Sequence, residues 1–304
     1  MKHRRMAPAG NRSPKRCPTA LRALLGLVMA LLSGWVQAEA VELRLDSGII
    51  AQANLHRGEP GKPAVVILHG FLQTNQFPTV QYLADALADD GYTVLTPNLS
   101  LDIDRRGQSL ACEAIHTHTM EGETAELRAW IEWLAALTPA PIVVIGHSTG
   151  GIQVLAQTVT RPHPRTRAII LISPTYFGAG PVNVEGPEDQ RRAEEDLTQG
   201  RRDPQTYALT FCQRYLTLPA AYLSYLYWDA ARSLEAIQGL SGVRVVLIVG
   251  LGDDRLDSSW VAHLEATGTR ILGVEGADHF FESGHELELG DAVEESLRYL
   301  DSKP

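Results

Sequence analysis

Six short runs dominated by apolar residues recur along the chain. They cover residues 64–68, 92–95, 142–145, 168–172, 243–249 and 271–274. A run without polar alternation predicts a strand buried on both faces of a parallel sheet. Segments with helical periodicity lie between the runs, at residues 80–88, 124–137, 152–159, 260–266 and 292–300. This alternation predicts an α/β fold with a doubly wound, mostly parallel sheet.

Three segments depart from this alternation of strands and helices. Residues 41–45 and 49–55 alternate around Asp46-Ser47-Gly48, which predicts a β-hairpin. Residues 176–239 predict a helical cap inserted over an active site, because they interrupt the succession of strands and helices. The aromatic residues that we expect on helices of this cap are Tyr207, Phe211, Tyr215, Tyr222, Tyr225, Tyr227 and Trp228. Residues 100–120 predict a long loop, which we expect near the entrance of the same active site because loops above about 15 residues are often functional.

The N-terminus has the three parts of a bacterial secretory signal peptide. A basic segment precedes the apolar residues 24–32, and Val36-Gln37-Ala38 supplies small residues for cleavage after Ala38 or Ala40. The alternative is a membrane anchor, but the apolar stretch is shorter than the roughly 20 residues that span a bilayer. We therefore expect a signal peptide over residues 1–38 and a secreted or periplasmic domain over residues 39–304, with no stable membrane span after cleavage.

Loss of residues 1–38 would make the chain strongly acidic. It removes seven of the 27 Lys and Arg residues and none of the 36 Asp and Glu residues, so the formal net charge changes from -9 to -16. Such a charge argues against nucleic acid or an anionic membrane surface as a partner. The sequence also lacks the glycine-rich signatures of phosphate binding, and no cofactor is expected.

Two cysteines, Cys112 and Cys212, remain after removal of the signal peptide. An even pair in an oxidising compartment is compatible with a disulfide. The alternative is that both are small buried hydrophobic residues. Sequence alone leaves these alternatives open.

The pentapeptide Gly146-His147-Ser148-Thr149-Gly150 follows the apolar run 142–145 and leads into a helical pattern. A serine at a sharp strand-to-helix turn has strained backbone geometry, and small residues two positions away avoid a clash there. Because Gly146 and Gly150 satisfy that steric demand, Ser148 is the candidate nucleophile.

A serine hydroxyl needs a nearby base, and an imidazole that titrates close to neutral pH suits the proton transfer. His279 is the best candidate, because it follows the last apolar run by a short turn and so reaches the edge of the sheet where ligands bind. His285 is the nearest rival. The other histidines considered are expected in turn packing or on the surface: His69, His116, His118, His147 and His263. No metal is expected, because His116 and His118 lack a third and a fourth ligand.

Four motifs at expected strand ends give the chain a family resemblance. They are His69-Gly70-Phe71, the pentapeptide around Ser148, Gly250-Leu251-Gly252-Asp253-Asp254, and Gly276-Ala277-Asp278-His279-Phe280-Phe281. With these motifs in this order, the chain resembles the serine esterase and lipase branch of the α/β-hydrolase fold family over nearly all of residues 39–304. The resemblance implies an eight-stranded sheet with a cap insertion at about residues 176–239.

The resemblance also implies roles for particular residues. Asp253 is the expected acid, which would fix the tautomer of His279, and Asp254 is the alternative. The backbone N–H groups of Phe71 and Thr149 are the expected oxyanion donors.

These residues together predict a serine hydrolase that cleaves a carboxylic ester through an acyl-enzyme on Ser148. The alternatives are an acyltransferase, a thioesterase or a peptidase with the same triad, or a noncatalytic binding protein that keeps the fold. The expected partner is a small-molecule or lipid-like ester. Neither the identity of the substrate nor the oligomeric state follows from the sequence, because this scaffold carries many chemistries.

Overall fold

The computed structural model describes residues 38–178 and 185–301. The chain divides into two units between Gln37 and Ala38, and the fold described below belongs to the second. The expected signal peptide thus lies outside the described residues, apart from Ala38 at its end.

An eight-stranded sheet forms the centre of the fold, in the order β1-β2-β4-β3-β5-β6-β9-β10. Its strands are β1 (Glu39–Arg44), β2 (Ile50–His56), β3 (Ala64–Leu68), β4 (Thr93–Asn98), β5 (Ile142–His147), β6 (Thr166–Ile172), β9 (Arg244–Gly250) and β10 (Arg270–Val274). The first two strands form the expected hairpin, and β2 pairs with β4 in antiparallel register. All other pairings are parallel, which confirms the predicted doubly wound, mostly parallel sheet.

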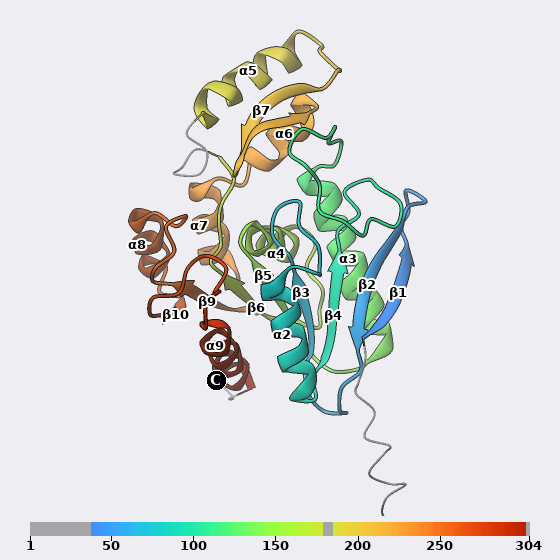
Figure 1. Ribbon diagram of the computed structural model, residues 1–304, viewed down its shortest axis with the longest axis vertical. Coiled ribbons are helices and arrows are strands. Elements are labelled where there is room, and N and C mark those ends of the chain that lie inside the picture. Colours follow the sequence, from blue (N-terminus) through green and yellow to red (C-terminus); the bar gives the residue numbers. More distant parts are fainter. Residues whose placement is uncertain (1–37, 179–184, 302–304) are drawn as a thin grey trace, which may run out of the picture. The chain divides into compact units, whose positions relative to one another are not determined.

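Helices cover both faces of this sheet (Figure 1). On one face α2 (Pro78–Asp89) and α9 (Glu286–Asp301) pack on alternate strand residues such as Val65 and Ile67. On the other face α3 (Met120–Leu137), α4 (Thr149–Thr160), α7 (Ala230–Gly239) and α8 (Ser258–Ala266) pack on residues such as Val66 and Leu68. Burial on both faces explains why the strands read as continuous apolar runs. Across the described ranges, the helices are too short or too polar to cross a membrane.

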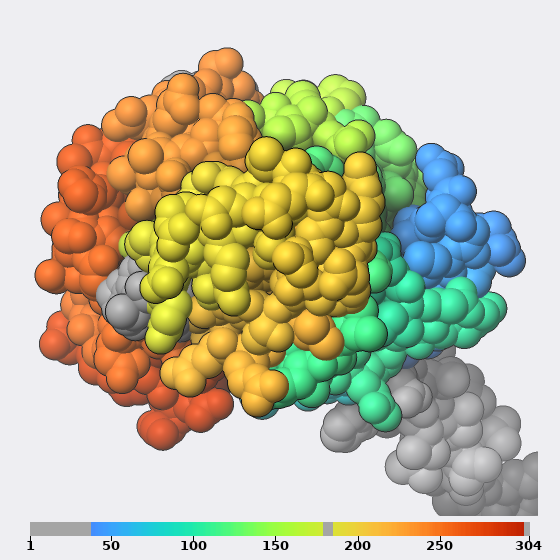
Figure 2. Space-filling view, turned by 90° about the horizontal axis from the view of Figure 1, so that it is seen from above, coloured from blue at the N-terminus to red at the C-terminus, as the bar shows by residue number. Residues whose placement is uncertain are grey.

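The interval between β6 and β9 holds the elements that we call the cap, residues 186–226. They are α5 (Gly186–Thr198), β7 (Gln205–Leu209), β8 (Cys212–Thr217) and α6 (Pro219–Leu226). They lie beyond the carboxyl ends of the parallel strands (Figure 1), and the yellow part of the cap covers the middle of the face seen in Figure 2.

The expectation that the aromatic segment of the cap is helical throughout is wrong. Residues 205–217 form an antiparallel hairpin in which Tyr207 pairs with Tyr215. Tyr207, Leu209, Cys212 and Tyr215 are buried in the core, so the hairpin packs its apolar side chains against the rest of the domain. Only the tyrosines that follow, Tyr222 and Tyr225, lie on a helix, α6.

A disulfide joins the cap to the long loop that was expected at residues 100–120. The sulfur atoms of Cys112 and Cys212 are bonded, and an isolated β-bridge pairs His116 with Thr217 nearby. The His116 N–H donates to the Leu216 carbonyl over 2.8 Å, and the Thr217 hydroxyl donates to the His116 carbonyl over 2.8 Å. Of the two alternatives for these cysteines, the structure therefore has the disulfide.

Reduction of this disulfide is expected to lower the free energy of unfolding by about 2–4 kcal/mol, because the bond closes a long loop in the unfolded chain. The two cysteines are 100 positions apart in the sequence. The measurement is denaturant unfolding with and without a thiol reductant. A double variant, Cys112→Ser with Cys212→Ser, serves as the control and should not respond to the reductant. Equal stability of the oxidised and reduced wild type would contradict the prediction.

Candidate active site

The turn from β5 into α4 holds Ser148 in a backbone conformation that side chains rarely adopt, with φ 58° and ψ -131°. The two flanking glycines make this turn sterically possible. A Cβ atom on Gly146 would lie 2.3 Å from the Gly150 carbonyl oxygen, and one on Gly150 would lie 2.4 Å from the His69 carbonyl oxygen. Any larger residue at either position would force the turn to open. Ser148 therefore projects from a strained, tightly packed elbow, as the pentapeptide predicts.

Three side chains that are far apart in the sequence meet at this elbow. His279, in the loop after β10, lies with its Nε2 atom 2.9 Å from the Ser148 hydroxyl oxygen. Its Nδ1 atom lies 2.7 Å from an Asp253 carboxylate oxygen. His279 and Asp253 are buried, whereas Ser148 is partly exposed. The three groups form a continuous chain of hydrogen bonds that ends at the accessible hydroxyl.

The carboxylate of Asp253 is held in its ionised form. Burial raises the pKa of Asp253, but the hydrogen bond and charge of His279, together with the Arg255 N–H, outweigh it. The net result is a pKa of Asp253 below its ordinary value. The Arg255 N–H donates to Oδ1 over 2.9 Å, which leaves Oδ2 to accept from His279. An ionised acceptor at Nδ1 leaves Nε2 of His279 free to accept a proton from Ser148.

Two backbone N–H groups beside Ser148 are available as donors. Within residues 38–178 and 185–301, neither the Phe71 N–H nor the Thr149 N–H donates a hydrogen bond. The turn that carries Phe71 lies against the nucleophile, since a Cβ atom on Gly70 would be 3.2 Å from Cβ of Ser148. Thr149 is the first residue of α4, where the helix dipole favours negative charge. The arrangement is suited to an oxyanion that forms next to Ser148.

A sequence model of the Alpha/beta hydrolase family matches residues 65–291. This span covers most of the chain, including the four motifs at the strand ends. The chain belongs to the α/β-hydrolase family. The resemblance that the four motifs carry is thereby confirmed. A comparison with curated proteins found no significant sequence match.

Solved structures of other α/β hydrolases share this fold at low sequence identity. Est1E from Butyrivibrio proteoclasticus is 17% identical with a TM-score of 0.63, over 87% of this chain and 99% of that chain. A thermophilic esterase from Thermogutta terrifontis is 19% identical with a TM-score of 0.59, over 87% of this chain and 100% of that chain. The esterase domain of a Rhodothermus marinus protein is 17% identical with a TM-score of 0.57, over 87% and 99% respectively. At such identities the likeness shows the fold alone.

The alternative candidates for the acid and the base of this hydrolase, Asp254 and His285, form no hydrogen bond with Ser148 or His279. The side chain of Asp254 is exposed, although it is adjacent to Asp253 in the chain. His285 contacts Glu288 over 3.2 Å and not Ser148. Asp257, another acidic residue of this loop, is the N-cap of α8, where its carboxylate accepts from the Trp260 N–H over 2.9 Å. Asp is a preferred residue at such a helix N-terminus, and Asp257 directly precedes Ser258, where α8 begins.

A buried arginine that the sequence analysis missed braces the turn that carries Phe71. Arg106 donates to the Gln73 carbonyl over 2.8 Å and to the Leu99 carbonyl over 2.6 Å. The Leu99 N–H donates to Nε2 of His69 over 3.2 Å. Burial, followed by the charge of Arg106, lowers the pKa of His69 to about 3, so this imidazole is neutral and can accept. A single arginine in an irregular loop carries no pattern from which this role could be read.

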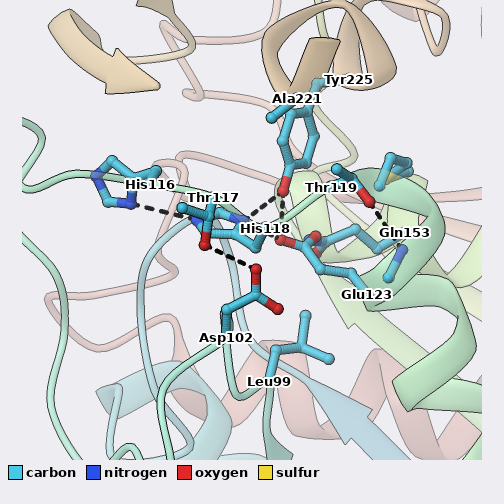
Figure 3. A network of polar contacts seen from close by, with 12 residues as sticks. Leu99, Asp102, His116, Thr117, His118, Thr119, Glu123, Gln153, Ala221 and Tyr225 are labelled. Atoms are coloured by element: carbon cyan, nitrogen blue, oxygen red, sulfur yellow. Dashed lines mark hydrogen bonds and ion pairs between the residues drawn. The ribbon is translucent and has the colours of Figure 1, made fainter. Parts of the chain in front are cut away.

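A second polar cluster joins the cap to the core (Figure 3). Nδ1 of His118 lies 2.7 Å from a Glu123 carboxylate oxygen, and the Tyr225 hydroxyl donates to the same oxygen over 2.5 Å. Gln153 of α4 also donates to Glu123, and Nε2 of His118 lies 3.2 Å from Nδ1 of His116. These side chains come from α3, α4, α6 and the disulfide-bonded loop, so the cluster fastens the cap over the helix that starts at the elbow.

The two histidines of this cluster are buried, not solvated. His69 and His147 are buried as well, and of the five histidines expected in turn packing or on the surface only His263 is exposed. In the part of the chain that the structure describes, no group of three or more His, Cys, Asp or Glu residues is arranged to hold a metal ion.

Proposed function

We propose that this α/β hydrolase cleaves a carboxylic ester through an acyl-enzyme on Ser148, with His279 as the base and Asp253 as the acid. The observation that carries the proposal is the hydrogen-bonded chain from Ser148 to His279, over 2.9 Å, and from His279 to Asp253, over 2.7 Å. Both distances lie in the range in which a proton can be transferred or an imidazole held in one tautomer.

In the first half-reaction Nε2 of His279 takes the proton of the Ser148 hydroxyl as the oxygen attacks the ester carbonyl carbon. The carbonyl oxygen becomes negative and accepts from the Phe71 and Thr149 N–H groups. The tetrahedral intermediate then collapses, and the bond to the alcohol oxygen breaks. His279 donates its proton to the departing alcohol, and the acyl group stays on Ser148.

In the second half-reaction a water molecule takes the place of the alcohol. His279 accepts one proton from the water, whose oxygen attacks the acyl carbon, and then returns the proton to Ser148 as the carboxylic acid leaves. Asp253 keeps its negative charge throughout and stabilises the imidazolium form of His279 in each half-reaction. The net change is one ester and one water converted into one acid and one alcohol.

Two further observations support this choice among the alternatives. Two solved structures with this fold carry the name esterase. Among the described residues, the N–H groups of Phe71 and Thr149 make no hydrogen bond, which suits donors to an oxyanion. An acyltransferase, a thioesterase or a peptidase would use the same groups, so only the acyl donor and acceptor tell them apart. A noncatalytic binding protein would need none of these alignments.

We also propose that the protein is exported. The basic and apolar segments before Ala38 support export, and the Cys112–Cys212 disulfide is of the kind that persists in oxidising compartments. The substrate would then be a small-molecule or lipid-like ester outside the cytoplasm.

Initial rates on p-nitrophenyl esters, with acyl chains from two to sixteen carbons, test the proposed reaction. We expect saturable hydrolysis with a preference for a limited range of chain lengths. Enzyme inactivated by a fluorophosphonate is the control for spontaneous hydrolysis. Rates that stay at the level of this control for every chain length would contradict an ester hydrolase. Addition of an alcohol distinguishes an acyltransferase, which would form a new ester in place of the acid.

A further inference from the structure

His147 directly precedes Ser148 and contacts the backbone of the loop that carries His279. It is the last residue of β5 and is fully buried. Its Nε2 atom lies 2.8 Å from the main-chain carbonyl oxygen of His279, a residue 132 positions away in the sequence. A single side chain therefore links the nucleophile elbow to the backbone of the candidate base.

Only one arrangement of protons fits this contact. Burial, followed by the nearby His279, lowers the pKa of His147 to about 3, so the imidazole is neutral. A carbonyl oxygen can only accept, so the single ring proton must lie on Nε2. Nδ1 has no hydrogen-bond partner among the described residues. The bond to the His279 carbonyl is thus the sole hydrogen bond of this buried ring within that part of the chain.

Apolar packing fixes the plane of the His147 ring. Phe77 stacks on it with an interplanar angle of 17° and centroids 6.2 Å apart, and the centroid of the neighbouring Phe280 ring is 5.9 Å away. The ring therefore cannot turn to another acceptor without displacing two aromatic side chains.

We propose that His147 is a positioning residue, whose Nε2–H holds the His279 backbone at the distance from which the His279 imidazole reaches Ser148. The proposal rests on the proposed function of Ser148 and His279. Asp253 holds the side chain of His279, through a hydrogen bond at Nδ1. His147 holds the main chain of His279, through a hydrogen bond at its carbonyl oxygen. Loss of the His147 bond would free the loop to move and lengthen the 2.9 Å contact between His279 and Ser148.

Two amide variants separate the hydrogen bond from simple packing. The terminal amide of His147→Gln reaches about as far from the backbone as Nε2 does and can donate to the His279 carbonyl. The amide of His147→Asn is one carbon shorter and ends near the position of Nδ1. Both variants place a neutral amide in the same buried site, and His263→Gln makes the same change at an exposed histidine.

We expect His147→Asn to lower kcat by about 10- to 100-fold with little change in KM, because a displacement of about 1 Å in a reacting group can cost 100-fold. His147→Gln should recover most of this loss, and His263→Gln should match the wild type. The rate at which a fluorophosphonate labels Ser148 should fall in parallel with kcat. Equal kcat in the Gln and Asn variants, or wild-type kcat in His147→Asn, would overturn the proposal.

A measurement on the wild type needs neither turnover nor a folded variant. Proton–nitrogen NMR of the histidine rings reports which nitrogen carries the proton, and we expect the Nε2–H form of His147 at neutral pH. A ring protonated on Nδ1, or on both nitrogens, would overturn the inference. A wild type with this tautomer but no reaction with esters or fluorophosphonate would instead contradict the proposed function.

Discussion

Ser148→Ala is expected to lower kcat for ester hydrolysis by about 10⁶-fold, the scale seen when a serine hydrolase loses its nucleophile. The variant keeps His279 and both oxyanion donors, so the residual rate comes from water attacking a bound ester. The measurement is steady-state hydrolysis of the p-nitrophenyl ester that the wild type prefers. Binding of substrate should change little, because the removed oxygen contributes to the transition state and not to ground-state affinity.

Ser283→Ala is a matched control for this variant. Ser283 has a φ of 61°, close to the 58° of Ser148, but it is exposed and lies outside the proposed triad. Both substitutions keep a Cβ atom in a strained backbone conformation, and we expect both proteins to remain folded. Near wild-type activity in Ser148→Ala, or a comparable loss in Ser283→Ala, would contradict the role of Ser148.

Asp253→Asn is expected to lower kcat by about 10⁴-fold, the scale at which loss of the acid in a serine triad acts. The amide is nearly the same size as the carboxylate but cannot stabilise the imidazolium form of His279. Its N–H₂ group can also donate to Nδ1, which would leave the proton of the neutral imidazole on Nε2, where it cannot accept from Ser148. The measurement is kcat across a range of pH, with thermal unfolding to show that the variant is folded.

Asp254→Asn makes the same chemical change one residue further along. Asp254 is exposed and Asp253 is buried against His279, so the second variant should keep wild-type activity. A large loss of activity in Asp254→Asn, together with wild-type activity in Asp253→Asn, would show that the acid is Asp254 and not Asp253. Because the two variants carry the same net charge, a general effect of the acidic surface would lower both equally.

The sheet could be predicted from sequence because its strands are buried on both faces. The run at residues 64–68 matches β3 at both ends, and residues 142–145 lie within β5. The first residues of the helices were less well predicted, because N-capping side chains decide where a helix begins. Helix α3 begins at Met120 and not at residue 124, because the Thr119 side chain accepts from the Gly122 N–H and starts the helix earlier.

The cap hairpin was missed because the spacing of its aromatic residues resembles that of a helix. Aromatic residues at positions 207, 211 and 215 are spaced four apart, which suggests one face of a helix, but residue 211 lies exposed in the turn between β7 and β8. Tertiary packing of the hairpin, with the disulfide at Cys212, overrides the helical spacing.

The candidate triad could be predicted because each member follows a strand at the same edge of the sheet. The structure brings Ser148, Asp253 and His279 together, and their catalytic roles stay predictions. The choice between Asp253 and Asp254 depended on side-chain direction, which the sequence does not give. The contacts of Arg106 and His147 could not be foreseen, because their acceptors are main-chain carbonyl oxygens that every residue possesses.

The central claim is that the Ser148 hydroxyl is activated for attack by the imidazole of His279. Reaction of the wild type with a fluorophosphonate, followed by peptide mass spectrometry, tests it most directly. We expect one modified site, on Ser148, and little labelling in His279→Gln. Labelling on another residue, or an undiminished rate of Ser148 labelling in His279→Gln, would contradict it.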